Sequence, residues 1–207
     1  MRLGIFGGTF DPVHYGHLLL AECCREQCRL EAVWFLPAAV PPHKQAPTLT
    51  PAAQRIEMLE LAIAGNAAFS VCRYEADRGG VNYTVDTLEH FHEEDSSREL
   101  FLLLGADMLA DLPNWRSPAG VCDLALPVAV RRPGCKPVDF DCLRGTASPE
   151  QIERMRRHQV EMPEIGISST ELRRRMKLGE SIRYRTSRAV EMYIETHGLY
   201  VQDSTFR

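Results

Sequence analysis

Hydrophobic and polar positions along this chain predict strands and helices in alternation. Short apolar runs, typical of buried strands, occupy Arg2–Phe6, Ala32–Leu36, Phe69–Arg73, Glu99–Leu104 and Leu124–Val130. Apolar residues recur at helical spacing in four segments: from about His17 to Cys28, from Thr50-Pro51 to near Gly65, from Val85 to about His92, and near Met108. Thr50 is the expected N-cap and Pro51 the first-turn proline of the second helix. Such alternation predicts a doubly wound parallel sheet, which is an open α/β fold.

The pattern changes after Pro133-Gly134. Ser148 and Gln151 have capping-box spacing and predict the start of a short charged helix, and residues 158–162 are expected to form a last strand. Two more helices are expected, Ser169–Lys177 and about Ser187–Glu195, the latter ending at Gly198. The chain therefore ends in a small helical part.

Composition narrows the class of protein. The chain has 207 residues, 44% of them hydrophobic and 25% charged, as in an ordinary soluble globular protein. A net charge of −4 gives no global basic field, so nucleic acid is not an expected partner and any phosphate site must be local. The first apolar segment ends at Gly7-Gly8, too short for a signal peptide or a membrane span, so we expect a cytoplasmic protein without a membrane partner. Seven cysteines without a CxxC pair are expected to be reduced thiols.

The strongest chemical signal is GGTFDPVHYGH, residues 7–17, between the first strand and the first helix. Gly7 and Gly8 leave backbone N–H groups open to a phosphate, while His14 and His17 stand three apart where the helix begins. A plain strand-to-helix turn is the alternative. The chain has no GxxxxGK[ST], GxGxxG or GxSxG string, which excludes a P-loop, a nicotinamide-cofactor fingerprint and a serine elbow. Amides and histidines around phosphate suit stabilisation of a charged transition state.

A second signal is ISSTELRRR, residues 167–175. Ser168 and Glu171 have capping-box spacing, so a well-capped helix alone would explain them. However, residues 173–188 hold seven basic side chains and one acid, Glu180, beside that helix N-terminus. This combination is suited to a di- or triphosphate, and Arg173 is the arginine that we expect to bind it.

A third, weaker signal is Gly105 followed by Asp107. A carboxylate just past the end of an apolar run suits ribose hydroxyls or a metal-bound phosphate, and an N-cap for the next segment is an equal alternative.

The strings GGTFDPVHYGH, PPHK, GAD and ISSTELRRR, in this order, resemble those of bacterial nicotinate-mononucleotide adenylyltransferases of the nucleotidyltransferase superfamily. The resemblance covers nearly the whole chain, up to Tyr193–Tyr200. It implies a Rossmann-like core over residues 1–165 and a C-terminal helical subdomain over residues 166–207. It also implies transfer of the adenylyl group of ATP to nicotinic acid mononucleotide, with release of pyrophosphate, in NAD biosynthesis. HxGH identifies the reaction and not the acceptor, because phosphopantetheine adenylyltransferases share it.

The motifs and the resemblance together give a set of candidate site residues. Catalysis is expected from His14, His17 and Arg173. ATP is expected to contact Gly7, Gly8, Thr9, Phe10, His14, His17, Gly105, Asp107, Ile167, Ser168, Ser169 and Arg173. The mononucleotide is expected to contact Thr9, Lys44, Thr84, Asp107, Trp115 and Arg132, with His43 beside Lys44 near its phosphate. Mg²⁺ would be carried by the ATP phosphates, with no dedicated protein ligand.

The resemblance further implies how the acceptor is chosen. Trp115 would stack on the nicotinate ring, and backbone amides near Tyr83-Thr84 would receive its carboxylate. Core packing is the alternative for Trp115. Nicotinamide mononucleotide or phosphopantetheine as acceptor, and a nucleotide sensor without turnover, stay open as alternatives, although the intact histidine pair argues against a sensor.

Two segments depart from the family pattern. Thr186-Ser187 stand where many relatives have proline, which leaves open how the terminal helices are joined. Residues 134–147 match nothing in the family and could mark a homodimer contact or a plain loop, so the oligomeric state is also left open.

Overall fold

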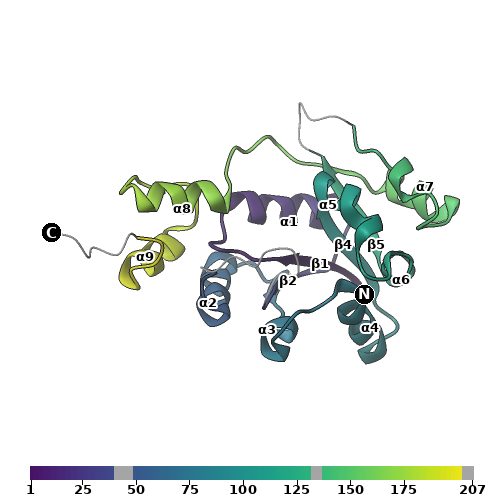
Figure 1. Cartoon of the computed structure of the whole chain (residues 1–207), viewed down its shortest axis with the longest axis horizontal. Helices are drawn as coiled ribbons and strands as arrows, with labels where there is room; N and C mark the ends of the chain where they lie inside the picture. The colour runs from purple at the N-terminus through teal and green to yellow at the C-terminus, as the bar shows by residue number, and fades with distance from the viewer. Residues whose placement is uncertain (40–48, 132–136, 202–207) are drawn as a thin grey trace.

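The fold is a parallel sheet with helices on both faces. The computed structural model describes residues 1–39, 49–131 and 137–201 (Figure 1). Within them a six-stranded sheet has the order β3-β2-β1-β4-β5-β6, and all neighbouring strands are parallel. The strands are β1 (Arg2–Gly8), β2 (Ala32–Pro37), β3 (Phe69–Val71), β4 (Glu99–Gly105), β5 (Leu126–Arg131) and β6 (Val160–Glu161). This order is that of the doubly wound Rossmann-type sheet, so the predicted fold class is confirmed.

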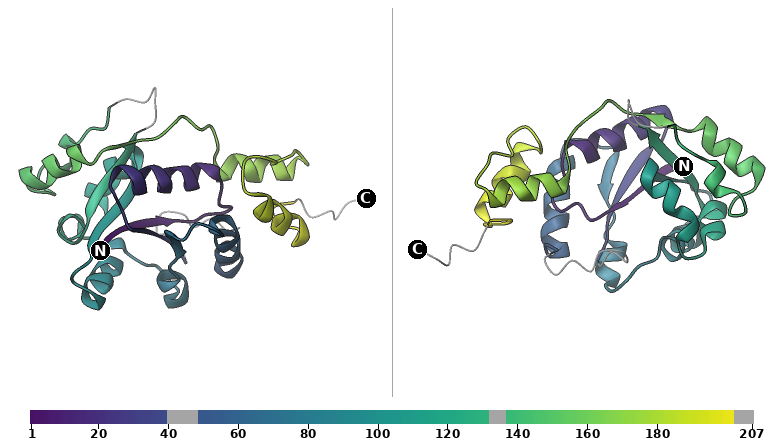
Figure 2. Two further views of the ribbon diagram at one scale, coloured as in Figure 1. Left: turned by 180° about the vertical axis from the view of Figure 1, so that it is seen from behind. Right: turned by 45° about the horizontal axis from the view of Figure 1, so that its top comes forward.

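The helices surround the sheet and extend beyond it. They are α1 (Tyr15–Gln27), α2 (Ala52–Ile63), α3 (Tyr74–Arg78), α4 (Thr84–Glu94), α5 (Ala106–Asp111), α6 (Pro118–Leu124), α7 (Pro149–Arg157), α8 (Ser169–Lys177) and α9 (Arg188–Thr196). Two 3₁₀ turns span Leu112–Asn114 and Asp141–Leu143. Figures 1 and 2 show α1 on one side of the sheet, α3 and α4 on the other, and the α8–α9 pair beyond one end. There α9 packs against α2.

The strands form because their side chains are buried on both faces, as parallel sheets require. Leu3 and Ile5 of β1 and Phe101 of β4 are buried together in the core. Packing explains why position 4 is a glycine. A Cβ there would lie 2.8 Å from the Leu30 side chain, so glycine lets the turn before β2 approach β1. The six cysteines among the described residues are free thiols, as expected.

Several helix starts differ from the sequence prediction. Helix α1 begins two residues earlier than expected, with His14 as its N-cap, so both histidines lie at its head. The predicted N-cap role of Thr50 is wrong, because Pro51 occupies that position of α2. Thr50 is instead buried, and its N–H donates to the carboxylate of Asp11 over 3.5 Å.

Serine caps start three later helices. Ser148 and Gln151 form the predicted capping box of α7, with bonds of 3.2 and 2.7 Å. Ser168 caps α8 by accepting from the Glu171 N–H over 3.2 Å, and Ser187 caps α9. These caps explain why the predicted bounds of α8 agree with the structure.

No helix in the described parts of the chain is long and apolar enough to span a membrane.

Candidate active site

The glycine turn lies at the carboxyl edge of the sheet, where β1 ends at Gly8 and β4 ends at Gly105. Gly7 is exposed, and a Cβ there would meet nothing within 4 Å, so the outer side of the turn is open. Glycine at position 8 is explained differently, by the close packing of the Phe10 ring. A Cβ at Gly8 would lie 3.0 Å from the Phe10 ring, which is buried against the turn from a left-handed backbone with φ 49°. The edge therefore carries a short turn with open backbone above a buried aromatic ring.

The two predicted histidines lie against each other. Their ring centroids are 3.7 Å apart at an interplanar angle of 16°, and His14 is only 6% exposed. The His14 N–H donates to Nδ1 of His17 over 3.2 Å. Since Nδ1 of His17 accepts this bond, the neutral ring carries its proton on Nε2. His17 is thereby set up as a hydrogen-bond donor on the side away from its own backbone.

The second motif meets the first at the head of α1. The Ser169 hydroxyl donates to the carbonyl of Pro12 over 2.9 Å, and Arg173 Nη1 donates to the carbonyl of Asp11 over 2.6 Å. A Cβ at Gly16 would lie 3.0 Å from the His14 ring and 3.5 Å from the Ile167 carbonyl, so this glycine allows the close approach. The structure thus brings together the two strings that sequence reasoning singled out separately.

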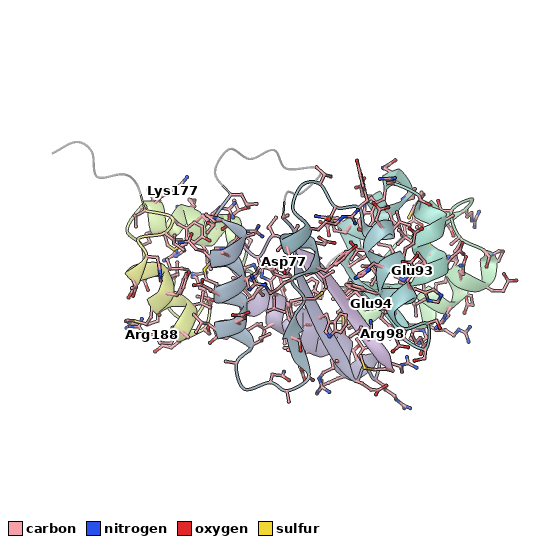
Figure 3. The ribbon with its side chains drawn as sticks, turned by 90° about the horizontal axis from the view of Figure 1, so that it is seen from below. Asp77, Glu93, Glu94, Arg98, Lys177 and Arg188 are labelled. Carbon is pink, nitrogen blue, oxygen red and sulfur yellow. The ribbon has the colours of Figure 1, made fainter. Side chains whose placement is uncertain are left out.

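The basic cluster behind α8 is largely paired with acids. Arg173 also approaches the Thr170 hydroxyl over 3.4 Å. The ion pairs among the described residues are Arg174–Glu171, Arg174–Glu180, Arg175–Glu180, Arg183–Glu191, Arg188–Glu191 and Arg188–Glu195. Glu171 and Glu191 lie just outside the interval that we counted as seven bases against one acid, so the positive charge is less concentrated than the sequence suggested. Figure 3 shows Lys177 and Arg188 on the α8–α9 end of the molecule, at its outer side.

Asp11 is a buried residue that the motif analysis did not select. It is 2% exposed, and its carboxylate accepts from the Tyr200 hydroxyl as well as from the Thr50 N–H. Burial, and then the nearby Asp11 carboxylate, raise the pKa of Tyr200, so the phenol stays a donor. The only sequence signal for this contact was that the family resemblance extends to Tyr200.

The connection between α8 and α9 also bonds to the turn. Thr186 is buried, and its hydroxyl donates to the carbonyl of Val13 over 2.9 Å. The Tyr15 N–H donates to the carbonyl of Arg185 over 3.1 Å. Thr186 therefore joins the terminal helices to the turn, and Ser187 caps α9.

The segments expected to hold the nicotinate ring lie side by side. Thr84 is the first residue of α4, so its N–H belongs to the helix turn whose donors have no partner within the helix. The Arg116 guanidinium lies 4.6 Å from the centre of the Tyr83 ring. Trp115, next to Arg116, is half-buried against the core, and its Nε1 donates to the Asp111 carboxylate over 3.2 Å. An indole fixed in this way could present a face to a ring near Thr84.

Glu75 is an acid near this region that sequence reasoning missed. The hydroxyl of Thr87, in the first turns of α4, donates to Glu75 Oε1 over 2.9 Å. Burial raises the pKa of the Glu75 carboxyl above its usual range, and the Thr87 bond opposes this only in part.

Gly105 and Asp107 lie where β4 ends and α5 begins, at the carboxyl edge of the sheet. Asp107 is exposed in the first turn of α5, whose N-cap is Gly105, so the alternative N-cap explanation for Asp107 is wrong. The described residues contain no group of three or more His, Cys, Asp or Glu side chains suited to a metal. His43, Lys44 and Arg132 lie outside the described residues.

The fold and the site together define a nucleotidyltransferase of the α/β type: a glycine turn leads into two stacked histidines, and a second helix start approaches the same turn. The family model described as "Cytidylyltransferase-like" matches residues 5–175. The chain belongs to this family and, within it, to the nicotinate-nucleotide adenylyltransferases.

Curated relatives and solved structures agree with this assignment. A Thermomicrobium roseum protein named "Probable nicotinate-nucleotide adenylyltransferase" is 44% identical over 96% of this chain and 91% of its own length. A Thermus thermophilus protein of the same name is 44% identical over 97% of this chain and all of its own length. The fold is also that of Plasmodium falciparum nicotinic acid mononucleotide adenylyltransferase complexed with NaAD, with a TM-score of 0.76 at 19% identity, covering 96% of this chain and 97% of that one.

Proposed function

We propose that this chain transfers the adenylyl group of ATP to nicotinic acid mononucleotide, giving nicotinic acid adenine dinucleotide and pyrophosphate, in NAD biosynthesis. The observation that carries the proposal is the convergence of the two motifs: Ser169 bonds Pro12 and Arg173 bonds Asp11 at the head of α1. Relatives that share 44% of the sequence over nearly the whole chain bear the name of this activity.

In the proposed complex, ATP lies over the open glycine turn with its phosphates between the two helix starts. His14, His17, Ser168, Ser169 and Arg173 surround this position. The 5′-phosphate of the mononucleotide attacks the α-phosphorus in line; one phosphorus–oxygen bond forms and the bond to the leaving pyrophosphate breaks. Nε2 of His17 donates to an α-phosphate oxygen as charge develops. The chain supplies position and hydrogen bonds, so no protein nucleophile is needed.

Mg²⁺ fits this site as an ion that arrives with ATP. Mg²⁺ in such sites keeps several waters and is held through the substrate phosphates, so we assign it no dedicated protein ligand; the exposed Asp107 at the sheet edge is suited to a phosphate that carries the ion. When bound, Mg²⁺ neutralises charge on the leaving pyrophosphate. Asp107 also remains our candidate for the ribose hydroxyls, beside Gly105, whose missing side chain leaves room for its carboxylate: a Cβ would lie 2.6 Å from Asp107 Oδ1.

The acceptor is assigned to the region between α4 and Trp115. N–H groups at the start of α4, at Thr84, would receive the nicotinate carboxylate, because a helix N-terminus attracts an anion. Trp115 would cover the ring, with its orientation set by Asp111. Lys44 and Arg132 are proposed for the mononucleotide phosphate on the basis of the family resemblance, and Thr9 is proposed as a further contact of the mononucleotide.

Pyrophosphate release from ATP, measured across a panel of acceptors, tests the proposal. Nicotinic acid mononucleotide should be the preferred acceptor, since amides that receive a carboxylate bind a neutral carboxamide poorly. An equal or greater kcat/KM with nicotinamide mononucleotide would overturn the acceptor assignment. Release with phosphopantetheine alone would indicate the other acceptor class, and ATP binding without any release would indicate a sensor.

A further inference from the structure

The largest fully buried side chain among the described residues is a charged one. Arg55 on α2 is 0% exposed and lies behind the glycine turn, and none of the sequence motifs includes it. Arginine is almost never fully buried unless its donors and charge are satisfied. Its surroundings should therefore show what it does.

The Arg55 guanidinium donates to the backbone of three separate segments. Nε donates to the carbonyl of Thr50 over 2.8 Å, and Nη1 donates to the carbonyl of Thr9 over 2.7 Å. Nη2 donates to the carbonyls of Ala38 over 2.7 Å and Ala39 over 3.4 Å. One planar group thus joins the glycine turn, the residues after β2 and the residues before α2.

The positive charge of Arg55 is balanced by a carboxylate of the same turn, that of Asp11. Burial lowers the pKa of Arg55, and the nearby Asp11 carboxylate opposes this, with a smaller contribution from Tyr200. The direct partners are neutral carbonyls spread around the guanidinium plane. Only a side chain with several donors in a fixed fork can bond all of them at once, which lysine, with one nitrogen, cannot do.

Other bonds hold the turn at neighbouring carbonyls: the Ala38 N–H donates to Gly8 over 2.9 Å, and side chains of the C-terminal part donate to Asp11, Pro12 and Val13. Gly7 and Gly8 have no side chains, and the backbone between Gly8 and the head of α1 determines where His14 and His17 stand. The carbonyl of Thr9 is the one bonded by Arg55.

We propose that Arg55 is a positioning residue for adenylyl transfer: it fixes the glycine turn through the Thr9 carbonyl and so places the two histidines, without touching either substrate. This inference rests on the proposed function of the site. It assigns a role in the reaction to a residue of α2, in addition to the residues of the glycine turn and α8.

Arg55→Lys tests the proposal because it keeps the charge and removes the fork. A displacement of the turn of about 1 Å should lower kcat about 10²-fold, with a smaller change in the KM for ATP. Met155→Ala is the matched control, since Met155 is a buried side chain of α7, far from α8 in Figure 1. It should lower the melting temperature and keep the wild-type kcat. A folded Arg55→Lys variant with the wild-type kcat would overturn the proposal.

A double variant separates positioning from a general loss of stability. If Arg55 acts through the turn that places His17, the combined loss of kcat in Arg55→Lys/His17→Ala should be clearly smaller than the product of the two single losses. Losses that multiply independently, at temperatures where all variants are folded, would contradict a role through His17.

A third measurement does not depend on activity. Backbone order parameters from NMR relaxation should fall at Thr9 and Phe10 in Arg55→Lys, toward the flexible range below about 0.6, and stay unchanged in Met155→Ala. Unchanged order parameters at the turn would overturn the proposal even if the wild-type protein released no pyrophosphate with any acceptor. In that case the proposed function would fail separately.

Discussion

His17 shows how one backbone contact can prepare a side chain for catalysis. The His14 N–H occupies Nδ1 of His17, so the neutral ring donates through Nε2. If that donor meets an α-phosphate oxygen mainly in the transition state, His17→Ala should lower kcat about 10²- to 10³-fold while ATP affinity stays nearly unchanged. Initial rates and equilibrium binding of ATP measure the two effects separately.

The melting temperature of His17→Ala must be compared with that of the wild type, because a collapsed turn would imitate a catalytic defect. A folded His17→Ala protein with the wild-type turnover would show that this histidine is not catalytic, and the assignment of the whole turn would have to be rebuilt.

Arg173 lies at the meeting point of the two motifs, where it bonds the Asp11 carbonyl. Arg173→Lys keeps the positive charge but loses the planar fork that can hold phosphate oxygens by two parallel bonds. We expect kcat/KM for ATP to fall at least about tenfold, a loss of about 1.4 kcal/mol of transition-state stabilisation. Steady-state kinetics with ATP as the varied substrate measures it. A fully active lysine variant would reduce the role of Arg173 to general electrostatics.

Trp115 is fixed by Asp111 beside the start of α4. Trp115→Ala should raise the KM for the mononucleotide more than the KM for ATP, because the ring of the acceptor loses its stacking surface. Kinetics with each substrate varied in turn would reveal this. The reverse pattern would mean that the nicotinate ring lies elsewhere.

At the residue scale, sequence reasoning found the groups that carry chemical signatures. His14, His17, Ser169 and Arg173 were selected from two distant strings, and the structure brings them together. Asp11, Arg55 and Tyr200 were not selected, because their roles come from hydrogen bonds between segments far apart in the sequence. Nothing in local spacing distinguishes an arginine that will be buried from one in solvent.

At the scale of elements, local capping chemistry predicted helix starts well where the cap was a serine. Ser148, Ser168 and Ser187 each accept a backbone N–H at a helix start. Thr50 is not a cap because α2 begins one residue later, with Pro51 at the N-cap position, while the backbone of Thr50 bonds Asp11 and Arg55. Helix α3 was missed because its residues are at most partly buried, so the sequence shows no hydrophobic periodicity there.

The packing of α3 against α4 should depend on pH through Glu75. Burial raises the folded-state pKa of Glu75 above its unfolded value, so its contribution to stability is fully present below the unfolded pKa, at about 4.3, and is lost as pH rises through the folded pKa. Glu75→Gln cannot ionise and keeps an acceptor for Thr87. The stability of the variant relative to the wild type should therefore increase as the pH rises from the unfolded pKa through the raised folded pKa of Glu75.

Urea unfolding of both proteins at several pH values in this range measures the effect. Thr87→Val is the companion variant, since it removes the hydroxyl that favours the ionised form of Glu75 and should make the pH dependence steeper. A difference between Glu75→Gln and wild type that does not change with pH would contradict the environment assigned to Glu75.

At the scale of the whole molecule, the sequence predicted the class of sheet but not the order of its strands. Alternating elements implied a doubly wound parallel sheet, and the observed order confirms it. The division at residue 165 stays a prediction; bonds from Ser169, Arg173 and Thr186 to the turn tie the C-terminal helices to the core. Such contacts are decided by tertiary packing, which a single sequence does not display.

The contact between Tyr200 and Asp11 joins the two ends of the described chain, 189 residues apart. Tyr200→Phe removes a donor from a carboxylate that is almost fully buried, so the free energy of unfolding should fall by about 1–3 kcal/mol. Chemical denaturation at neutral pH measures it. Tyr184→Phe is a suitable control, because Tyr184 is 85% exposed and its hydroxyl should contribute little. Equal stability of Tyr200→Phe and wild type would show that water replaces the lost bond without cost.

The bond from Ser169 to Pro12 spans 157 residues, and this distance has a consequence for synthesis on the ribosome. The glycine turn and both histidines are synthesised well before the helix that faces them, because α8 lies far downstream in the sequence. A nascent chain that stops before residue 168 already contains all six strands, yet only one half of its phosphate site. The proposed adenylyl transfer therefore requires translation past α8, and a product that is terminated before residue 168 should release no pyrophosphate from ATP.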